Sequence, residues 1–594
     1  MSSRLRSQAI FEVLVLVGAV LLSGAPLLAG RELKGHDITA YLIYAQQTAA
    51  NLRGGLLLPA WASDLNGGFG GPGLIFYPPF VNTVHALLPL AGLPLATGIG
   101  GLALAGSLLS GLAMRGWLKA AGFGPGALWA AVFYVVAPYR LVDLYERGAL
   151  AEHWAFVFAP LILWIGASGR LSPRRRVAMG ALAIAALALT NLPLAVLFGL
   201  SLGSAMLVLP STRRAVLPLL LAAPLGLSLA AFSLGPQALA FRWLRVELWF
   251  GETGVRAYRP STNTLFHSGA MDAGFNVRVS AALLATVLLG LAAALLMSAE
   301  GRRSTETRVW LAVLAAAFVA TLGPFGPLWD AAPLLSKLQF PWRAAAPATL
   351  AASALMAFLA RGRAASLAIL GALVAVPFAT VTATAPPSPR RPAPVNGLAG
   401  RSFPDPRAVH EAGGDDGTWV QRGMWDYWYV PRTAPEAFFL EMTGGRSARL
   451  DLQRTRPAVF HAAPETPVDV VRWDRLDKEV SLVAPRPGAL VWHVLGFPGM
   501  SVAVDGRPSA LLLDRSTGLV AVEVPAGRHV ASWRWRPFPP LRAFRGLSGL
   551  AIVVVLLLLG LPDAASRVQS RLGRVAGLGV PGTSGSPEDR DSSS

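Results

Sequence analysis

The chain has 594 residues, of which 53% are hydrophobic and only 14% charged, and its mean hydropathy is +0.50. Soluble domains carry about 25% charged residues, so this composition excludes a wholly soluble protein, a coiled coil and a disordered chain. The formal net charge is +19 and comes mostly from arginines in short segments between apolar runs. This pattern is typical of the positive-inside bias of membrane proteins, and it argues against nucleic-acid binding. The absence of cysteine excludes disulfides and thiolate chemistry.

Apolar runs of about 20 residues predict a polytopic α-helical membrane protein with about 12 spans. The first run follows a basic start, as a signal peptide would, but the many later runs favour an uncleaved helix. The predicted spans are 10–29, 98–114, 126–138, 150–168, 177–190, 192–209, 216–234, 280–297, 309–322, 344–359, 365–383 and 547–561.

The loop arginines predict the orientation of these spans. They all fall on the inner side only if the apolar run Phe76–Leu95 does not cross the membrane. That run contains four prolines, which interrupt a helix, so we expect a re-entrant or surface helix on the outer face. The membrane domain then covers residues 1–383, with outer loops at 30–95, 139–149 and 235–278 and a further outer segment at 323–343. Both termini are expected in the cytoplasm.

Residues 384–541 show short alternating segments instead of long apolar runs. This pattern predicts an extracytoplasmic antiparallel β-sandwich. Short alternating segments recur at 448–453, 479–484, 489–495, 501–504, 520–524 and 529–535, and Asp505-Gly506 suits a hairpin turn. The aromatic run 425–429 is either a sugar-stacking patch or part of the core. A last helix at 542–562 and a disordered cytoplasmic tail at 563–594 are expected to follow.

Two polar clusters stand at the outer ends of early spans. Lys34-Gly35-His36-Asp37 follows the first span and precedes apolar residues at helical spacing, which predict an amphipathic helix on the membrane. The second outer turn carries Asp143, Glu146 and Arg147, with Glu152 and His153 just after it. Acidic groups beside a low-dielectric region are costly, so they suggest a functional site. Asp37 is also a candidate helix N-cap, and the two roles are compatible.

Several motifs in order resemble a known family. They are Gly35-His36-Asp37, Phe76-Tyr77-Pro78-Pro79, Tyr145–Ala149 with Glu152, Gln339–Arg343, and the late segments 496–506 and 524–529. Together they resemble bacterial membrane proteins known as 6-pyruvoyl-tetrahydropterin-synthase-related, which are similar to YfhO-type proteins. Both belong to the broad GT-C glycosyltransferase architecture.

The resemblance implies a polyprenyl-phosphate-sugar donor and an acidic residue in the first outer loop. It makes Asp143 and Glu146 the candidate ligands of a divalent metal ion, although they do not form a tight Asp-x-Asp. His36 and His153 are alternative metal ligands, or structural hydrogen-bonding groups.

An inverting transfer from a lipid phosphate needs a base for the acceptor proton and positive charge for the leaving phosphate. Asp37 is the predicted catalytic base. Arg147 either binds the phosphate, with Lys34, or pairs with Glu146 or Glu152. Tyr77 is expected to line a groove for acceptor or lipid. The predicted substrate-binding set is Lys34, His36, Tyr77, Asp143, Glu146, Arg147, Glu152 and Arg343.

The predicted partners are the bilayer of the bacterial cytoplasmic membrane, the lipid-linked donor, and a glycan, lipid or protein acceptor, without nucleic acid. The alternative is a non-catalytic protein of the same architecture that binds or transports a lipid-linked glycan or assists envelope assembly. An ion-coupled transporter is less favoured, because the sequence shows no inverted repeat.

Overall fold

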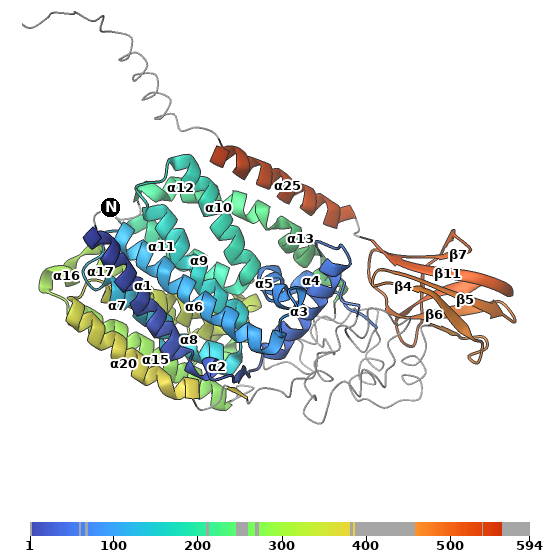
Figure 1. Cartoon of the computed structure of the whole chain (residues 1–594), viewed down its shortest axis with the longest axis horizontal. Helices are drawn as coiled ribbons and strands as arrows, with labels where there is room; N and C mark the ends of the chain where they lie inside the picture. The colour runs from blue at the N-terminus through green and yellow to red at the C-terminus, as the bar shows by residue number, and fades with distance from the viewer. Residues whose placement is uncertain are drawn as a thin grey trace, which may run out of the picture.

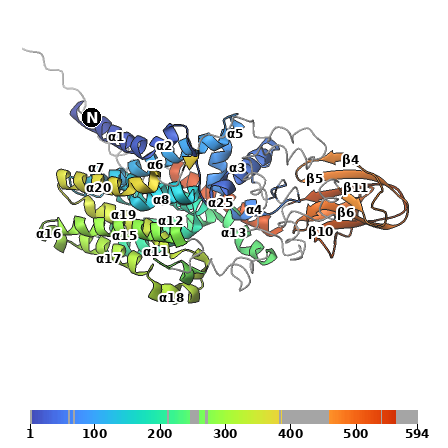
Figure 2. The ribbon, with the colours of Figure 1, turned by 90° about the horizontal axis from the view of Figure 1, so that it is seen from below.

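The computed structural model describes residues 3–58, 61–63, 65, 69–209, 213–244, 259–267, 273–380, 384–385, 458–536 and 539–560. It consists of a helical body and a separate lobe of β-strands at one end of that body, as both Figure 1 and Figure 2 show. The predicted strand 448–453, the aromatic run 425–429 and the tail 563–594 lie outside the described residues.

Every predicted span coincides with at least one helix. The long helices of the body are α1 (Ser3–Ser23), α6 (Leu95–Ala120), α7 (Ala127–Val136), α9 (Leu150–Ala167), α10 (Pro173–Thr190), α11 (Leu192–Val208), α12 (Arg213–Leu229), α13 (Ala231–Ala240), α15 (Ala273–Leu295), α17 (Thr305–Val319), α19 (Ala345–Met356), α20 (Arg361–Thr380) and α25 (Pro539–Gly560).

The predicted number of about twelve spans is not confirmed. Within the described ranges, six helices are long and apolar enough to cross a membrane, or eight if each of two bent pairs counts as one span. The pairs bend by 65° between α12 and α13 and by 81° after α17. Part of the difference comes from α19, whose 12 residues span only about 18 Å of a hydrocarbon core of about 30 Å. All 12 residues of α19 are buried among other helices.

Short elements connect the long helices. They are α2 (Ala25–Leu28), α3 (Ile38–Arg53), α4 (Gly73–Phe76), α5 (Pro79–Leu90), α8 (Pro138–Val142), η2 (Asp143–Arg147), η4 (Phe241–Trp243), η6 (Pro260–Asn263), α16 (Ala299–Arg303), η7 (Gly323–Phe325), α18 (Gly326–Ala331), η8 (Leu335–Leu338) and η9 (Pro341–Ala344). The run Phe76–Leu95 yields α5, which at 12 residues is too short to cross the membrane, and α6 begins only at Leu95.

Two short segments differ from their predicted form. The second outer loop, predicted at 139–149, is largely helical and fully buried rather than an open turn. The helix α3 is buried on more than one side, rather than lying on a surface with one face exposed. Ile38 and Tyr41 pack into the main helical core, whereas Ile43 and Tyr44 pack against the loop that follows.

The β lobe contains two antiparallel sheets around one apolar core, in agreement with the predicted C-terminal antiparallel β region. One sheet has the order β3-β6-β10-β9 and the other β4-β5-β11-β7-β8. Buried Trp492 and Trp533 contribute to the core from opposite sheets. The strands are β3 (Ala458–Phe460), β4 (Val468–Trp473), β5 (Asp477–Ala484), β6 (Gly488–Leu495), β7 (Met500–Val504), β8 (Arg507–Ser509), β9 (Leu512–Leu513), β10 (Leu519–Val524) and β11 (Gly527–Trp535).

The first outer loop joins the helical body to the β lobe. Trp61 and Phe69 from this loop lie in the same apolar core as the strands. The ring of Phe69 stacks on His493 at 3.9 Å between centroids, and the Phe69 carbonyl accepts a hydrogen bond from the Leu495 amide at 2.9 Å. A further pairing, between β1 (Glu32–Leu33) and β2 (Thr384–Ala385), connects the start of this loop to the chain that leaves α20.

Candidate active site

The candidate site is built around Arg147, the last residue of the π-helical turn η2. The chain enters this turn from the apolar helices α7 and α8 and leaves it at Gly148, whose φ of +64° is left-handed. Single π-helical turns occur frequently at functional sites. Here the turn places Asp143 and Arg147 on one side, where the two side chains form an ion pair of 3.0 Å.

Three carboxylates surround the Arg147 guanidinium. Its Nη1 lies 2.7 Å from Glu152 Oε1 and 3.0 Å from Asp143 Oδ1, and its Nη2 lies 3.3 Å from Asp37 Oδ2. Arg147, Asp143 and Glu152 are almost wholly buried, whereas the side chain of Asp37 is 39% exposed. The structure thus brings the two predicted acidic clusters together on one arginine. Glu146 and Glu152 were the two predicted alternative partners of Arg147, and the structure shows the ion pair with Glu152.

A second arginine completes the buried network. Arg343 Nε lies 2.6 Å from Glu152 Oε1, and Arg343 Nη1 donates a hydrogen bond to the Leu338 carbonyl at 2.7 Å. The hydroxyl of Tyr139 donates to the other Glu152 oxygen at 3.1 Å. The ring of Phe340 lies beneath both guanidinium groups, with centroid distances of 4.9 Å to Arg343 and 5.8 Å to Arg147. Buried charges need partners of this kind to offset their loss of hydration.

The network contains one more carboxylate than it has guanidinium groups. Asp37, Asp143 and Glu152 carry three carboxylates, and Arg147 and Arg343 carry two guanidinium groups. A charge is least costly where water reaches it, and Asp37 is the exposed member of the set.

The backbone around Asp37 is held by close contact with the π-helical turn. The Asp37 amide donates a hydrogen bond to the Arg147 carbonyl at 2.8 Å. Gly35 packs so closely that a Cβ there would lie 2.6 Å from the carbonyl carbon of Arg147. Asp37 stands at the N-cap position of α3, yet its side chain makes no capping hydrogen bond. The carboxylate pairs with Arg147 instead, through Oδ2, and part of the side chain remains exposed.

The remaining predicted residues have different surroundings. Glu146 is buried and pairs with Arg278 near the start of α15 rather than with Arg147. The ring of His36 meets Phe275 edge-on at 5.2 Å, and Phe275 precedes Arg278 by one helical turn. Lys34 is exposed. The ring of Tyr77 stacks on Tyr44 at 4.2 Å between centroids and meets Tyr41 edge-on at 5.3 Å.

The described residues hold no group of three or more His, Asp or Glu side chains that would hold a metal ion. Asp143 and Glu146, the candidate ligands, are turned to different arginines. His153 is buried within hydrogen-bond distance of Ser107 Oγ at 3.0 Å and of the Ala103 carbonyl at 2.9 Å, as expected for a structural histidine. Within the described part of the chain, the candidate ligands therefore do not form a metal site.

Three contributors to the site were not predicted from the sequence. Arg278 has no local signal, because an arginine near the start of an apolar helix is common. Tyr139 has no signal of its own, and Phe340 stands in the motif Gln339–Arg343 without a predicted role. Only the packing of distant segments brings these two rings to Glu152 and the arginines.

No family model matches the chain, and no curated protein matches it. Comparison with solved structures finds arabinofuranosyltransferase AftD from Mycobacteria, at 18% sequence identity and a TM-score of 0.39 over 63% of this chain. It also finds an oligosaccharyltransferase from Archaeoglobus fulgidus, at 13% identity and a TM-score of 0.38 over 70% of this chain. The matched part covers 26% of the AftD chain and 60% of the oligosaccharyltransferase chain. Similarities of this size do not establish the family to which the chain belongs.

Proposed function

We propose that the chain is a membrane glycosyltransferase that moves a sugar from a polyprenyl-phosphate donor to an acceptor at the outer face of the cytoplasmic membrane. The observation that carries this proposal is the position of Asp37. It is the partly exposed carboxylate of an otherwise largely buried network of ion pairs. An acceptor hydroxyl can approach such a carboxylate from the solvent, and a base must lie within hydrogen-bond reach of the proton that it takes.

In the proposed reaction, Asp37 takes the proton of the acceptor hydroxyl. The acceptor oxygen then bonds to the anomeric carbon, and the bond from that carbon to the phosphate oxygen breaks with inversion. The polyprenyl phosphate leaves with the electron pair. A bound base of this kind typically contributes about 10²–10⁴-fold to the rate.

We assign the leaving phosphate to Lys34 and Arg278 rather than to Arg147. Arg147 is already surrounded by three carboxylates, whereas Lys34 is exposed and the Arg278 side chain is 39% exposed. The contact between His36 and Phe275 brings the Lys34 segment next to the first turns of α15, where Arg278 lies. Arg147 then acts as a positioning residue that holds Asp37, while Glu152 and Arg343 fix Arg147 in turn. No step is assigned to a metal ion.

Replacing Asp37 with asparagine tests this role. Asp37→Asn keeps the shape of the side chain and removes the base, so we expect transfer to fall by about 10²–10⁴-fold while folding is retained. The measurement is a profile of polyprenyl-phosphate sugars in a deletion strain complemented with each variant. Glu32→Gln, in the same loop, is the matched control and should restore the wild-type profile. Full complementation by Asp37→Asn would exclude the base role.

The proposal also requires Asp37 and the β lobe to face the outside. A single cysteine at exposed Ser501, placed in the cysteine-free chain, should react with an impermeant maleimide in intact cells. A cysteine at Ser298, in the loop before α16, should react only after permeabilisation. The reverse pattern would contradict the proposed orientation.

A second candidate function is favoured by the ion pairs themselves. Because Arg147 and Glu152 already neutralise much of each other, the same network would also suit a non-catalytic protein that binds or transports a lipid-linked glycan. In that case Asp37→Asn would leave the lipid-linked sugar profile at the wild-type level. The complementation experiment therefore separates the two candidates.

A further inference from the structure

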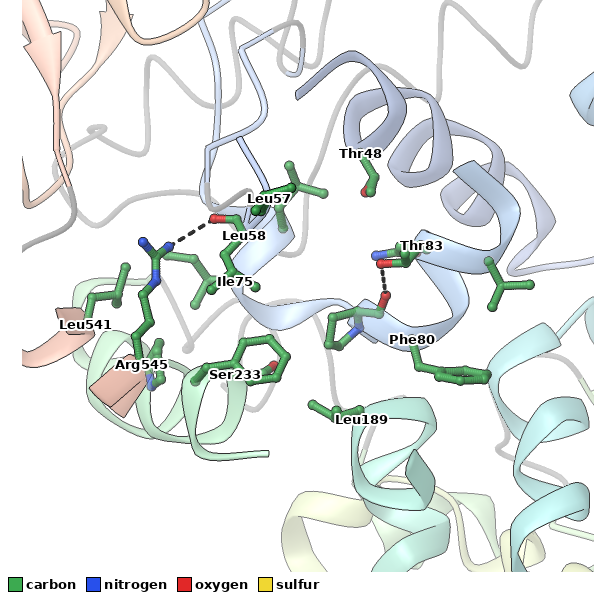
Figure 3. A pocket seen from close by; sticks show the side chains of 16 residues that line it. Thr48, Leu57, Leu58, Ile75, Phe80, Thr83, Leu189, Ser233, Leu541 and Arg545 are labelled. Carbon is green, nitrogen blue, oxygen red and sulfur yellow. Dashed lines mark hydrogen bonds between the residues drawn. The ribbon is translucent and has the colours of Figure 1, made fainter. Parts of the chain in front are cut away.

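A separate cavity of about 290 Å³ lies between the juxtamembrane segments and the last helix, α25. Figure 3 shows side chains from α3, α4 and α5 on one side of it and from α10, α13 and α25 on the other. Its walls are mainly apolar, with Ile75, Phe80, Leu189 and Leu541 among them. The volume lies near the lower end of the range of about 300–1,000 Å³ for ligand pockets, and the lining suits a hydrocarbon chain rather than a sugar.

One cation, Arg545, lies at an end of this apolar cavity. Its Nη2 donates a hydrogen bond to the Leu58 carbonyl at 2.9 Å (Figure 3). Across the part of the chain that the structure describes, no carboxylate forms an ion pair with Arg545, in contrast to the buried arginines of the candidate active site. A half-buried guanidinium beside an apolar wall favours an anion as its partner.

The position of Arg545 near one end of the apolar helix α25 suits contact with lipid headgroups. It is in the second turn of the helix, close to the β lobe, and the 15 residues from 546 to 560 follow it. That run is apolar and about 22 Å long, and many of its side chains are exposed as expected for contact with lipid tails. Arginines at the ends of spanning helices commonly meet the phosphate layer in this way.

The helix α25 is fixed where it borders the cavity. Phe544 lies against Gly235 of α13, where a Cβ would come within 2.4 Å of the ring. Ser548 accepts a hydrogen bond from the Phe232 amide at 2.9 Å and donates one to the Ser228 carbonyl at 3.0 Å. The cavity and its arginine therefore have a defined geometry.

A second polar group lines the cavity from the opposite side. Asn82 of α5 is 2% exposed, and its Oδ1 is buried without a hydrogen-bond partner among the described residues. A buried amide oxygen of this kind is costly unless a donor reaches it. A hydroxyl group on a bound molecule would supply that donor.

We propose that this cavity is a structural lipid site that takes one acyl chain of an anionic glycerophospholipid and pairs its phosphate with Arg545. Phosphatidylglycerol has the matching chemistry, because it combines an acyl chain, a phosphate and headgroup hydroxyls. The site is distinct from the candidate active site, with which it shares no lining residue. Thr48, its contribution from α3, lies ten residues beyond Ile38, or roughly 15 Å along the helix from the Asp37 end.

Native mass spectrometry of the full-length protein tests the proposal without any measurement of transfer. The purified protein is offered phosphatidylglycerol, phosphatidylcholine and undecaprenyl phosphate at equal concentrations, and the retained lipid is counted. We expect one tightly retained phosphatidylglycerol. Arg545→Gln should weaken its retention by roughly five- to tenfold, since a basic residue near a membrane surface contributes about that much to anionic lipid binding.

Two further variants distinguish binding in the cavity from a general attraction of anionic lipid to positive charge. Arg542→Gln removes the same charge one turn earlier on α25, does not line the cavity, and should retain the lipid. Leu189→Trp fills the cavity from α10 while Arg545 stays, and it should abolish retention. Equal losses with Arg542→Gln and Arg545→Gln, or undiminished binding to Leu189→Trp, would overturn the site. Preference for undecaprenyl phosphate over phosphatidylglycerol would overturn the assigned lipid.

Discussion

The candidate active site and the β lobe are stabilised in opposite ways. At the active site, five charged side chains from segments far apart in the sequence meet in a largely buried network. In the β lobe, two hydrogen-bonded sheets enclose an apolar core, and the pair Asp505–His529 lies on the surface of the lobe. The first arrangement depends on a few specific partners, whereas the second is distributed over many contacts.

This difference determines how each region should respond to mutation. Removing one member of a buried ion network leaves the others charged and unpaired, which costs more than the pair itself contributes. Removing part of an apolar side chain costs the lost burial plus a cavity, and the damage remains local. We therefore expect the active-site network to be more sensitive to a single change than the β lobe, although it contains fewer groups.

Arg147→Gln should have the largest effect. It leaves the buried carboxylates of Asp143 and Glu152 without their shared partner, so we expect a loss of about 3–5 kcal/mol in the free energy of unfolding. Thermal unfolding of the detergent-solubilised protein, followed by intrinsic fluorescence, measures it. The double variant Asp143→Asn with Arg147→Gln should recover part of this loss. An unfolding temperature within experimental error of wild type for Arg147→Gln would mean that the network contributes little.

Leu482→Ala in β5 should lower the free energy of unfolding by a smaller or similar amount. Its effect on hydrogen exchange should be confined to the β lobe. Leu482 is 3% exposed in the core of the β lobe, and truncations of this kind cost about 2–5 kcal/mol. Hydrogen exchange should increase in β4, β5 and β11, which are neighbours in one sheet, and remain unchanged around Arg147. Faster exchange at η2 and α9 in this variant would show that the two regions are not independent.

The smallest effect on stability is expected for the surface pair Asp505–His529 of the β lobe. The hydrogen bond to Asp505 raises the pKa of His529 above its ordinary 6.5, and the Val530 amide and His529 lower the pKa of Asp505 below 3.8. The His529 contribution is complete below pH 6.5 and is lost as the pH rises through the raised pKa. The Asp505 contribution is complete above pH 3.8 and is lost as the pH falls through the lowered pKa.

NMR titration of histidine ring signals checks this pair, with His529→Gln as the assignment control. In Asp505→Asn, the pKa of His529 should fall toward its ordinary value, with little change in overall stability because both groups are near the surface. A wild-type His529 pKa at or below 6.5 would contradict the pairing.

Local sequence patterns predicted the β lobe better than the site. Alternation located β5, β6, β7, β10 and β11 to within two residues at each end, and Asp505-Gly506 forms the turn with φ values of +51° and +74°. These features depend on neighbours in the chain. Positive φ at both central residues is the requirement of the tight hairpin that such a pair favours.

The active site was predictable only in part. The positions of Asp37 and Glu152 at the outer ends of early spans indicated that they would approach each other, and both contact Arg147. The pairing of Arg343 with Glu152 joins residues 191 positions apart, and that of Arg278 with Glu146 joins residues 132 positions apart. Such contacts arise from the packing of whole helices, and neither periodicity nor spacing in one segment specifies them.

The insertion of Trp61 and Phe69 into the core of the β lobe has a consequence for how the molecule unfolds. The same loop begins at Asp37, which is bonded to Arg147, and continues through α3 to these two rings. Truncation of the lobe would expose both rings and release the far end of that loop. The lobe and the loop residues around Trp61 and Phe69 are therefore expected to open together in native-state hydrogen exchange, while the network around Arg147 stays protected.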